Sequence, residues 1–203
     1  MIAGGRTTIP LRLEAWGSVF VMFRRPAAAP AVTLPPVTET TLATLGGPWT
    51  LSFPPQKGAP AALTVDHLAS WSASPEPGIR YFSGTGTYAR PLEAAAGWAA
   101  PGRRTWLDLG DVKNLAEVLV NGQSLGIVWH PPYRVDLTDV LRPGANTLEV
   151  RVTNAWVNRM IGDEQPDAAV KYTFADIKPY HANSPLLASG LLGPVRVLSV
   201  GTP

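Results

Sequence analysis

The sequence predicts an all-β fold, either a β-sandwich or a β-barrel. Short runs rich in apolar and β-branched residues recur along most of the chain, and turn signals containing Gly, Pro or Asn-Gly separate them. Glycine and proline are abundant, with 19 and 21 residues in a chain of 203. Sustained helical periodicity is absent, and only one helical turn is expected, in "LTDVLRPG". About ten short strands at this spacing are typical of a sandwich or a barrel.

The N-terminal part of the chain is expected to be organised separately from the rest. Residues 1–25 contain two strand-like runs around Trp16-Gly17-Ser18, and the second, Val19 to Phe23, is continuously apolar, as in a strand buried on both faces. Residues 26–45 are rich in Ala, Pro and Thr, the composition of an extended linker. Because two strands are not stable alone, we expect them to join the main sheet, pair with a second copy, or end a preceding domain.

Residues 46–203 are expected to form the main domain. Its strand-like runs are, in order, "WTLSF", "AALTV", "IRYFSGTGTYARPL", "RTWLDLG", "LAEVLVNG", "SLGIVW", "YRVDLT", "NTLEVRVTN", "VKYTF" and "GPVRVLSV". Asn121-Gly122 favours a type I′ hairpin turn, since both residues tolerate positive φ. "WHPPY", residues 129–133, predicts a corner at the rim of the fold, because proline cannot donate to a strand ladder.

The composition excludes several functional classes. Hydrophobic residues make up 45% of the chain and charged residues 16%, as in a folded globular protein. The net charge of +2 gives no basic face for a nucleic acid. Without cysteine, disulfides, zinc–thiolate sites and cysteine nucleophiles are excluded. The run Val19 to Phe23 is too short for a signal peptide or a membrane span, so we expect a soluble chain that binds no membrane.

Most sequence motifs of catalysis are also missing. Neither Ser83 nor Ser189 has the glycines of a nucleophile elbow, and "GTGT" lacks the lysine and the helix of a phosphate-binding loop. The three histidines, His67, His130 and His181, are scattered and show no metal-ligand spacing. The residues themselves therefore predict no metal site and no cofactor.

Two groups of residues have the chemistry of carbohydrate contacts. One is the aromatic corner at residues 129–133, and the other is the amide- and arginine-bearing stretch "TNAWVNRM". Aromatic rings stack on the apolar face of a sugar, and amides and guanidinium groups bond its hydroxyls. The predicted ligand-binding residues are Trp129, His130, Tyr133, Asn154, Trp156, Asn158 and Arg159. An aromatic corner can equally plug the end of a sandwich.

The acidic segment "IGDEQPD" carries the carboxylates closest to that stretch. It is either a solvated loop or the lining of a site. A glycosidase works with two carboxyl groups about 5–10 Å apart. If the chain is an enzyme, the candidates are Asp163 and Glu164, with Asp136 or Glu117 as the partner.

Several segments together resemble one family. They are "GIRYFSGTGTYARPL", the stretch from "WLDLGDVKNLAEVLVNG" to "NRMIGDEQ", and "SPLLASGLLGPVRVL". Over roughly residues 46–200 the chain resembles the C-terminal domain of bacterial α-L-rhamnosidases of glycoside hydrolase family 106. It is more distantly similar to the sugar-binding domain of family 2 β-galactosidases and β-glucuronidases. Residues 1–25 resemble the last strands of the preceding domain in such enzymes.

The resemblance implies a jelly-roll β-sandwich of the galactose-binding-domain-like type. In such enzymes the catalytic carboxylates lie in an upstream barrel, which nothing in this sequence resembles, so no catalytic residue can be assigned from the resemblance. Sandwiches of this type often bind a structural calcium ion, so the resemblance also makes calcium a candidate ligand of this domain.

Three functions therefore remain. The first is a carbohydrate-binding or ancillary domain, whose partner is a carbohydrate. The second is a small stand-alone glycosidase of β-galactosidase or α-rhamnosidase type. The third is a purely structural or oligomerisation module, whose exposed surface packs on a catalytic domain or forms a homo-oligomer through the N-terminal strands.

Overall fold

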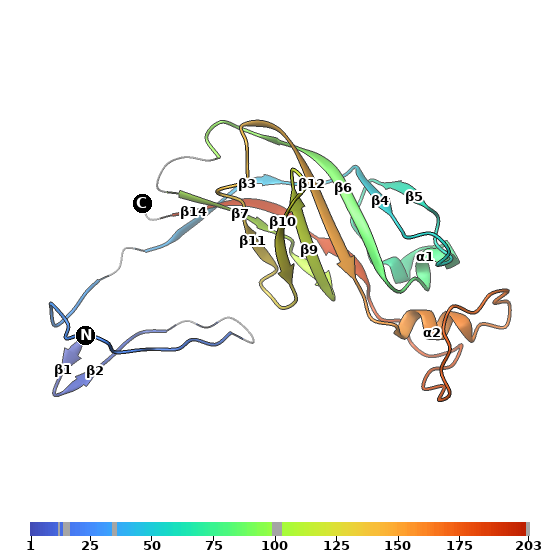
Figure 1. Ribbon diagram of the computed structural model, residues 1–203, viewed down its shortest axis with the longest axis horizontal. Helices are drawn as coiled ribbons and strands as arrows, with labels where there is room; N and C mark the ends of the chain where they lie inside the picture. The colour runs from blue at the N-terminus through green and yellow to red at the C-terminus, as the bar shows by residue number, and fades with distance from the viewer. Residues whose placement is uncertain (12, 14–16, 34–35, 99–102, 202–203) are drawn as a thin grey trace.

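The computed structural model describes residues 1–11, 13, 17–33, 36–98 and 103–201. Its larger sheet contains six strands, in spatial order β10 (Gln123–Val128), β9 (Leu115–Val120), β12 (Gly144–Thr153), β6 (Thr85–Ala94), β4 (Trp49–Ser52) and β5 (Ala62–Val65). Its smaller sheet contains four, in the order β11 (Arg134–Asp136), β7 (Arg103–Asp108), β14 (Arg196–Gly201) and β3 (Thr38–Thr44). Strand neighbours in both sheets are antiparallel. The two sheets form the body of the molecule (Figure 1), and the predicted all-β sandwich is confirmed.

The remaining elements are short. Two further pairs of strands are β1 (Ile2–Ala3) with β2 (Arg6–Thr7), and β8 (Asp111–Lys113) with β13 (Gly190–Gly193). The described helices are η1 (Trp71–Ala73), α1 (Pro77–Arg80) and α2 (Val157–Asp163). None of the described helices is long and apolar enough to cross a membrane.

The core lies between the two sheets and follows from strand alternation. In β12, Leu148, Val150 and Val152 are buried at every second position, and the smaller sheet contributes Leu107 and Val197 to the same cluster. Full burial of one such aliphatic side chain stabilises the fold by about 1.5–3 kcal/mol. The period-two pattern in the sequence thus sets which face of each strand turns inward.

A buried aromatic group joins the larger sheet to the β8–β13 pair. The Tyr88 hydroxyl accepts hydrogen bonds from the Trp71 indole at 2.7 Å and from the Leu191 backbone N–H at 3.2 Å. Burial raises the pKa of Tyr88 to about 12. Gly190, at φ +96°, allows this approach, because a Cβ there would lie 2.7 Å from the indole nitrogen.

Two local predictions in the main domain are confirmed. Asn121 and Gly122 have φ values of 52° and 79°, and the flanking residues Val120 and Gln123 pair directly across the turn. The corner at residues 129–133 separates β10 from β11, which belong to different sheets. The prolines therefore lie where the chain crosses from one sheet to the other.

Three expected elements differ in the structure. The linker was expected to reach residue 45, but Thr38–Thr44 form β3 and pair with β14, so the sandwich begins earlier. Residues 170–174, "VKYTF", form no strand, because the backbone N–H groups of Tyr172 and Thr173 donate to a side chain instead. The run "IRYFSG" begins in α1, and the strand starts only at Thr85.

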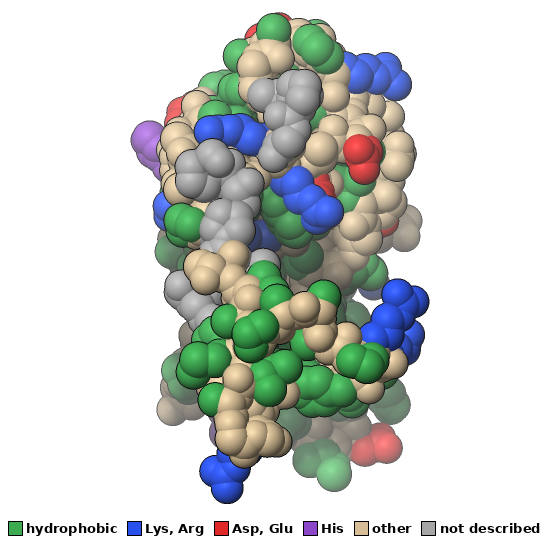
Figure 2. All heavy atoms as spheres, turned by 90° about the vertical axis from the view of Figure 1, so that its left-hand side faces the viewer, with side chains coloured by type: hydrophobic (Ala, Val, Ile, Leu, Met, Phe, Trp, Pro, Cys, Tyr) green, Lys and Arg blue, Asp and Glu red, His purple; other side chains and the backbone are tan. Residues whose placement is uncertain are grey.

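The N-terminal arm, residues 1–33, leaves the sandwich at its β3 end (Figure 1). Of the expected strand at residues 11–13, residue 12 lies outside the described residues, as does Trp16. The run Val19–Phe23 is no buried strand: all five side chains are exposed, and Phe20 is 90% exposed. Figure 2 shows apolar side chains gathered on this side of the molecule. An apolar run alone does not supply the neighbouring strand that would bury it.

Candidate functional site

The predicted site residues converge at one end of the larger sheet. In β10, Val128 is opposite Ala116 of β9, which in turn is opposite Val152 of β12. Trp129 and Asn154, each just beyond its strand, therefore lie at the same end of the sheet, two strands apart. At a strand spacing of about 4.8 Å, their backbones are separated by about 10 Å.

Two tryptophans are exposed at this end. Trp129 is 68% exposed, and its ring meets the half-buried His130 ring edge-on, with 4.9 Å between centroids. Trp156, at the start of α2, is 50% exposed. By contrast, Trp49 and Trp71 are buried in the core. Trp129 and Trp156 are therefore available as ligand platforms.

Tyr133 connects the corner to the start of α2. Its hydroxyl donates to the Asn114 carbonyl at 3.4 Å, and the Asn114 side chain accepts from the Ala155 N–H at 3.1 Å. Ala155 directly precedes Trp156. One chain of contacts thus fixes the two aromatic segments relative to each other.

Asn154 has a structural task in the fold. Its amide oxygen accepts from the Gly84 N–H at 2.9 Å, and its amide nitrogen donates to the Phe82 carbonyl at 2.8 Å. Next to it, the Ser83 hydroxyl donates to the Ala155 carbonyl and accepts from the Arg159 N–H. The Asn154 amide holds the segment before β6 against the end of β12. Since its oxygen and its nitrogen are both bonded to the backbone, it has little hydrogen-bonding capacity left for a ligand.

Asn158 fastens the distal part of the chain in the same way. Its side chain accepts from the Leu187 N–H at 2.8 Å and donates to the Leu187 carbonyl at 2.7 Å. It is buried and also lies within 3.4 Å of the Ser189 hydroxyl. Residues 164–189 form a lobe that leaves the sandwich at α2 (Figure 1). The Asn158 amide fastens the C-terminal end of this lobe back to α2.

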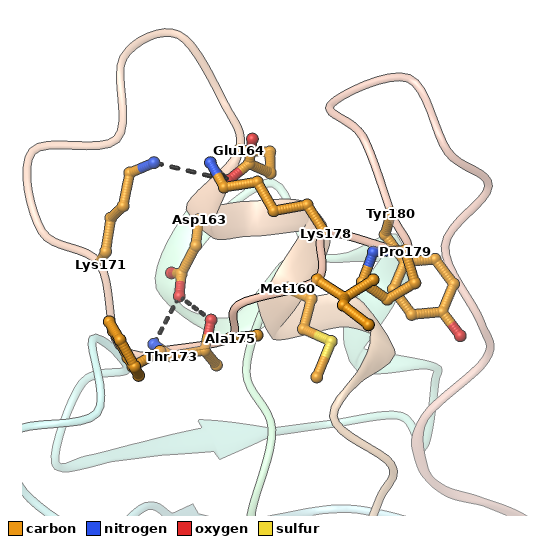
Figure 3. A pocket seen from close by; sticks show the side chains of 11 residues that line it. Met160, Asp163, Glu164, Lys171, Thr173, Ala175, Lys178, Pro179 and Tyr180 are labelled. Carbon is orange, nitrogen blue, oxygen red and sulfur yellow. Dashed lines mark hydrogen bonds and ion pairs between the residues drawn. The ribbon is translucent and has the colours of Figure 1, made fainter.

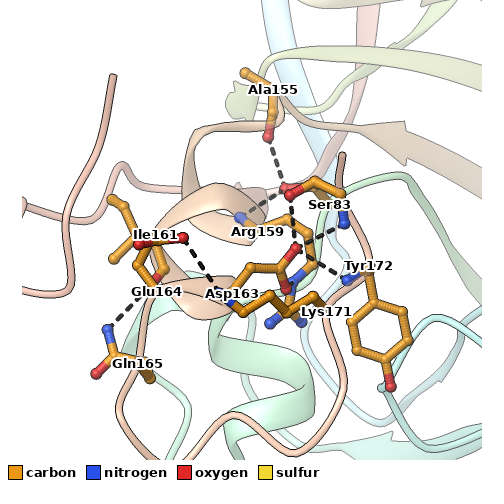
Figure 4. A network of polar contacts seen from close by, with 10 residues as sticks. Ser83, Ala155, Arg159, Ile161, Asp163, Glu164, Gln165, Lys171 and Tyr172 are labelled. Carbon is orange, nitrogen blue, oxygen red and sulfur yellow. Dashed lines mark hydrogen bonds and ion pairs between the residues drawn. The ribbon is translucent and has the colours of Figure 1, made fainter. Parts of the chain in front are cut away.

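Asp163 is the centre of a polar network at the base of the lobe (Figure 4). It is only 3% exposed, and it forms an ion pair with Arg159 Nε at 2.9 Å. Its other oxygen accepts from the Tyr172 N–H, the Thr173 N–H and the Thr173 hydroxyl at 2.9, 2.7 and 2.6 Å. The carboxylate is thus buried, and both of its oxygens accept hydrogen bonds. Asp163 is therefore not part of a solvated loop, and its oxygens are not free to act as a nucleophile.

Glu164 lines, together with Asp163, a cavity of about 200 Å³ between α2 and the lobe (Figure 3). It pairs with Lys178 at 2.9 Å and with Lys171 at 3.5 Å. The Lys178 hydrogen bond, followed by the charges of the two lysines, lowers the pKa of Glu164. A general acid of a glycosidase needs the opposite shift.

The two proposed partner carboxylates lie elsewhere. Asp136 is on β11 in the smaller sheet, where it accepts from Thr138 and pairs with Arg104. Glu117 is on β9 and pairs with Arg151. Among the described residues, neither carboxylate contacts the Asp163–Glu164 segment.

Some residues of this region were not anticipated from the sequence. The Arg159–Asp163 pair has the i,i+4 spacing of a helical ion pair, which is a usable signal, but α2 itself was not predicted. Ser83, Tyr172 and Lys178 carry no local signal, because their partners are distant in the sequence. No group of three or more potential metal-ligating side chains occurs among the described residues.

One family model matches the chain. It covers residues 82–183 and describes a "glycosyl hydrolase 2 galactose-binding domain-like" unit. The match spans β6 to β12, α2 and most of the lobe, which includes all the predicted ligand-binding residues.

Known relatives are much longer than this chain. The solved rhamnosidase from Novosphingobium sp. PP1Y matches 87% of this chain and 17% of its own, with 46% identity and a TM-score of 0.82. A putative β-glucuronidase from Formosa agariphila is 36% identical in an alignment of 176 positions, and the match covers 75% of this chain and 15% of that protein. A Ruminococcus gnavus β-glucuronidase, at 19% identity and a TM-score of 0.52 over 82% of this chain and 28% of its own, shares the fold.

Proposed function

Since the chain belongs to the glycosyl hydrolase 2 galactose-binding domain-like family, we propose that it is a non-catalytic carbohydrate-binding domain of the glycoside hydrolase type. The observation that carries this proposal is the pair of exposed tryptophans, Trp129 and Trp156, at one end of the larger sheet. Exposed indole rings that lie at the same end of a sheet offer apolar faces on which a sugar can stack, with an N–H available for a hydrogen bond. The 46% identity to a rhamnosidase favours α-L-rhamnosidase enzymes of family 106 as the setting.

The proposed sugar site is narrower than the set expected from the sequence. Trp129 and Trp156 would stack on pyranose faces, and His130 and Tyr133 would bond hydroxyls from the corner. Asn154 and Asn158 act one step away, because their amides already hold the loops that carry the tryptophans.

Calorimetric titration with rhamnose-, galactose- and glucuronate-containing oligosaccharides tests the proposal. We expect binding in the millimolar range or tighter, and a loss of up to about tenfold in affinity for Trp129→Ala or Trp156→Ala, because an aromatic contact contributes about 0.5–1.5 kcal/mol. Phe20→Ala, on the N-terminal arm, is the control and should bind as the unmodified chain does. Binding that is unaffected by either tryptophan substitution would refute the site.

The glycosidase alternative has a separate test. Assays with chromogenic α-rhamnosides and β-galactosides should show no turnover by this chain. Turnover that is abolished by Glu164→Gln in a folded variant would establish the alternative. The geometry offers it little support, since Asp163 is buried in an ion pair and the pKa of Glu164 is lowered.

A packing role is favoured by a different observation. The side chains of Phe20, Met22 and Phe23 on the N-terminal arm are all exposed. Figure 2 shows apolar side chains gathered on this side of the molecule. Such a surface is typical of a contact with another domain or a second copy. Light scattering after size exclusion would show a dimer if the arm pairs between copies, and a monomer at all concentrations would contradict pairing.

A further inference from the structure

A groove lies at the base of the lobe, and its lining does not include Trp129 or Trp156. It has a volume of about 530 Å³ and lies between the β4–β5 loop, α1 and the base of the lobe. Its lining includes two arginines, two tyrosines and one acidic residue, which are Arg80, Arg159, Tyr81, Tyr172 and Asp167. The volume falls within the usual range of ligand pockets, about 300–1,000 Å³.

The Arg159 side chain presents unused donors to this groove. It is 8% exposed and its Nε is paired with Asp163, while its guanidinium carbon stacks 4.8 Å from the centre of the Tyr172 ring. Within the described part of the chain, no hydrogen bond or ion pair reaches its two Nη nitrogens. Figure 4 shows these nitrogens beside Tyr172 with no contact drawn to them. These N–H groups are therefore available to a ligand that enters the groove.

Arg80, at the end of α1, offers the same kind of donors to the groove. Its Nε donates to the Ser74 carbonyl at 2.8 Å, which fixes the side chain. Its Nη nitrogens have no protein partner among the residues that the structure describes. Two guanidinium groups, each held by Nε and open at Nη, are suited to a planar or tetrahedral oxyanion.

Glycines keep the walls close together. A Cβ on Gly162 would lie 2.5 Å from Arg159 Nη2, and a Cβ on Gly58 would lie 3.0 Å from the Tyr172 hydroxyl oxygen. Gly78 approaches the Gly58 carbonyl so closely that a Cβ would overlap it. The backbone therefore leaves room for these arginine and tyrosine side chains.

The charges of the groove point to a mixed ligand. Asp163 pairs with Arg159, and Asp167 lines the groove together with Arg80, so the formal charges of these four side chains sum to zero and a simple ion is not specially attracted. Asp167 and the tyrosine hydroxyls can bond neutral hydroxyl groups. We propose that this groove binds a sugar that carries an oxyanion, either the carboxylate of a uronic acid or the ester of a sulfated sugar.

Titration calorimetry with D-glucuronate, glucose 6-sulfate, D-glucose and inorganic sulfate tests this site. We expect one or both acidic sugars to bind at least about tenfold more tightly than glucose, because hydrogen bonds to charged groups contribute about 1.5–3 kcal/mol. Glucuronate alone would assign a uronic acid, and glucose 6-sulfate alone a sulfated sugar. Equal binding of glucose, or binding of an adventitious ion only, with inorganic sulfate active and both acidic sugars inactive, would overturn the proposal.

Variants locate the binding. Arg80→Gln should weaken binding of the acidic sugar about tenfold, whereas Arg104→Gln, which changes an exposed arginine of β7, should leave it unchanged. Loss with Trp129→Ala and not with Arg80→Gln would move the ligand to the tryptophan site and refute the groove. The two sites can thus fail independently. If Arg80→Gln does not fold, a nuclear magnetic resonance titration of the unmodified chain replaces it. The Nε–H signals of Arg80 and Arg159 should then shift when the acidic sugar is added, and unchanged signals would refute the proposal.

Discussion

Asp163→Asn is the substitution that most sharply separates a structural from a catalytic role for the acidic segment. The carboxylate and Arg159 have side-chain exposures of 4% and 8%, so the variant leaves a buried guanidinium without its counter-charge. Removing one partner of a buried ion pair costs about 3–5 kcal/mol. The asparagine oxygen can still accept from Tyr172 and Thr173, which places the expected loss near the lower value, about 3 kcal/mol.

Urea unfolding followed by tryptophan fluorescence and circular dichroism measures this loss. Hydrogen exchange at the Tyr172 and Thr173 amides should report local opening of the lobe. The matched control is Asp136→Asn. Asp136 pairs with Arg104 at 3.5 Å, and the Arg104 side chain is 69% exposed, so we expect this variant to lose less than about 1 kcal/mol of stability. If Asp163→Asn costs no more than the control and both amides stay protected, the structural role is refuted.

Further expected outcomes concern the core and the N-terminal segment. Tyr88→Phe should cost about 2–4 kcal/mol in urea unfolding, since the buried N–H donors of Trp71 and Leu191 lose their acceptor. Because the pKa of Tyr88 is raised to about 12, its contribution is present below pH 10 and lost as the pH rises from about 10 to 12. Unfolding measured across that window should therefore show a smaller decline for Tyr88→Phe than for the unmodified chain. Deleting residues 1–36 should change the free energy of unfolding by less than about 1 kcal/mol. Deleting residues 1–45 should lower it by at least about 2 kcal/mol, because β3 and its packing on the core are lost. Equal stability of the two truncated chains in urea unfolding would contradict the assignment of β3.

The local chemistry of turns and strands was readable from the sequence. Asn121-Gly122 predicts its own φ values, and the apolar alternation of Leu148, Val150 and Val152 predicts an inward face. β3 was missed because "TETTLAT" is polar and mostly exposed, and its place depends on the edge that β14 offers. The apolar run Val19–Phe23 led to the opposite error, since its pattern contains no information about a partner strand.

The sequence predicted which residues gather at this end of the sheet, but not what each side chain does there. The aromatic corner and "TNAWVNRM" do meet at one end of the sheet. However, Asn154, Asn158 and Arg159 are tied to segments that lie 70, 29 and 4 residues away in the sequence. Only the fold shows that these polar groups hold loops in place, and that two tryptophans remain exposed beside them.

The most direct test of the central claim is a titration followed through the tryptophan indole N–H signals in a nitrogen-15 correlation spectrum. With a rhamnose-containing oligosaccharide, the signals of Trp129 and Trp156 should shift together, while those of the buried Trp49 and Trp71 stay in place. If saturating oligosaccharides leave the Trp129 and Trp156 signals unmoved, this end of the sandwich is not a carbohydrate-binding site.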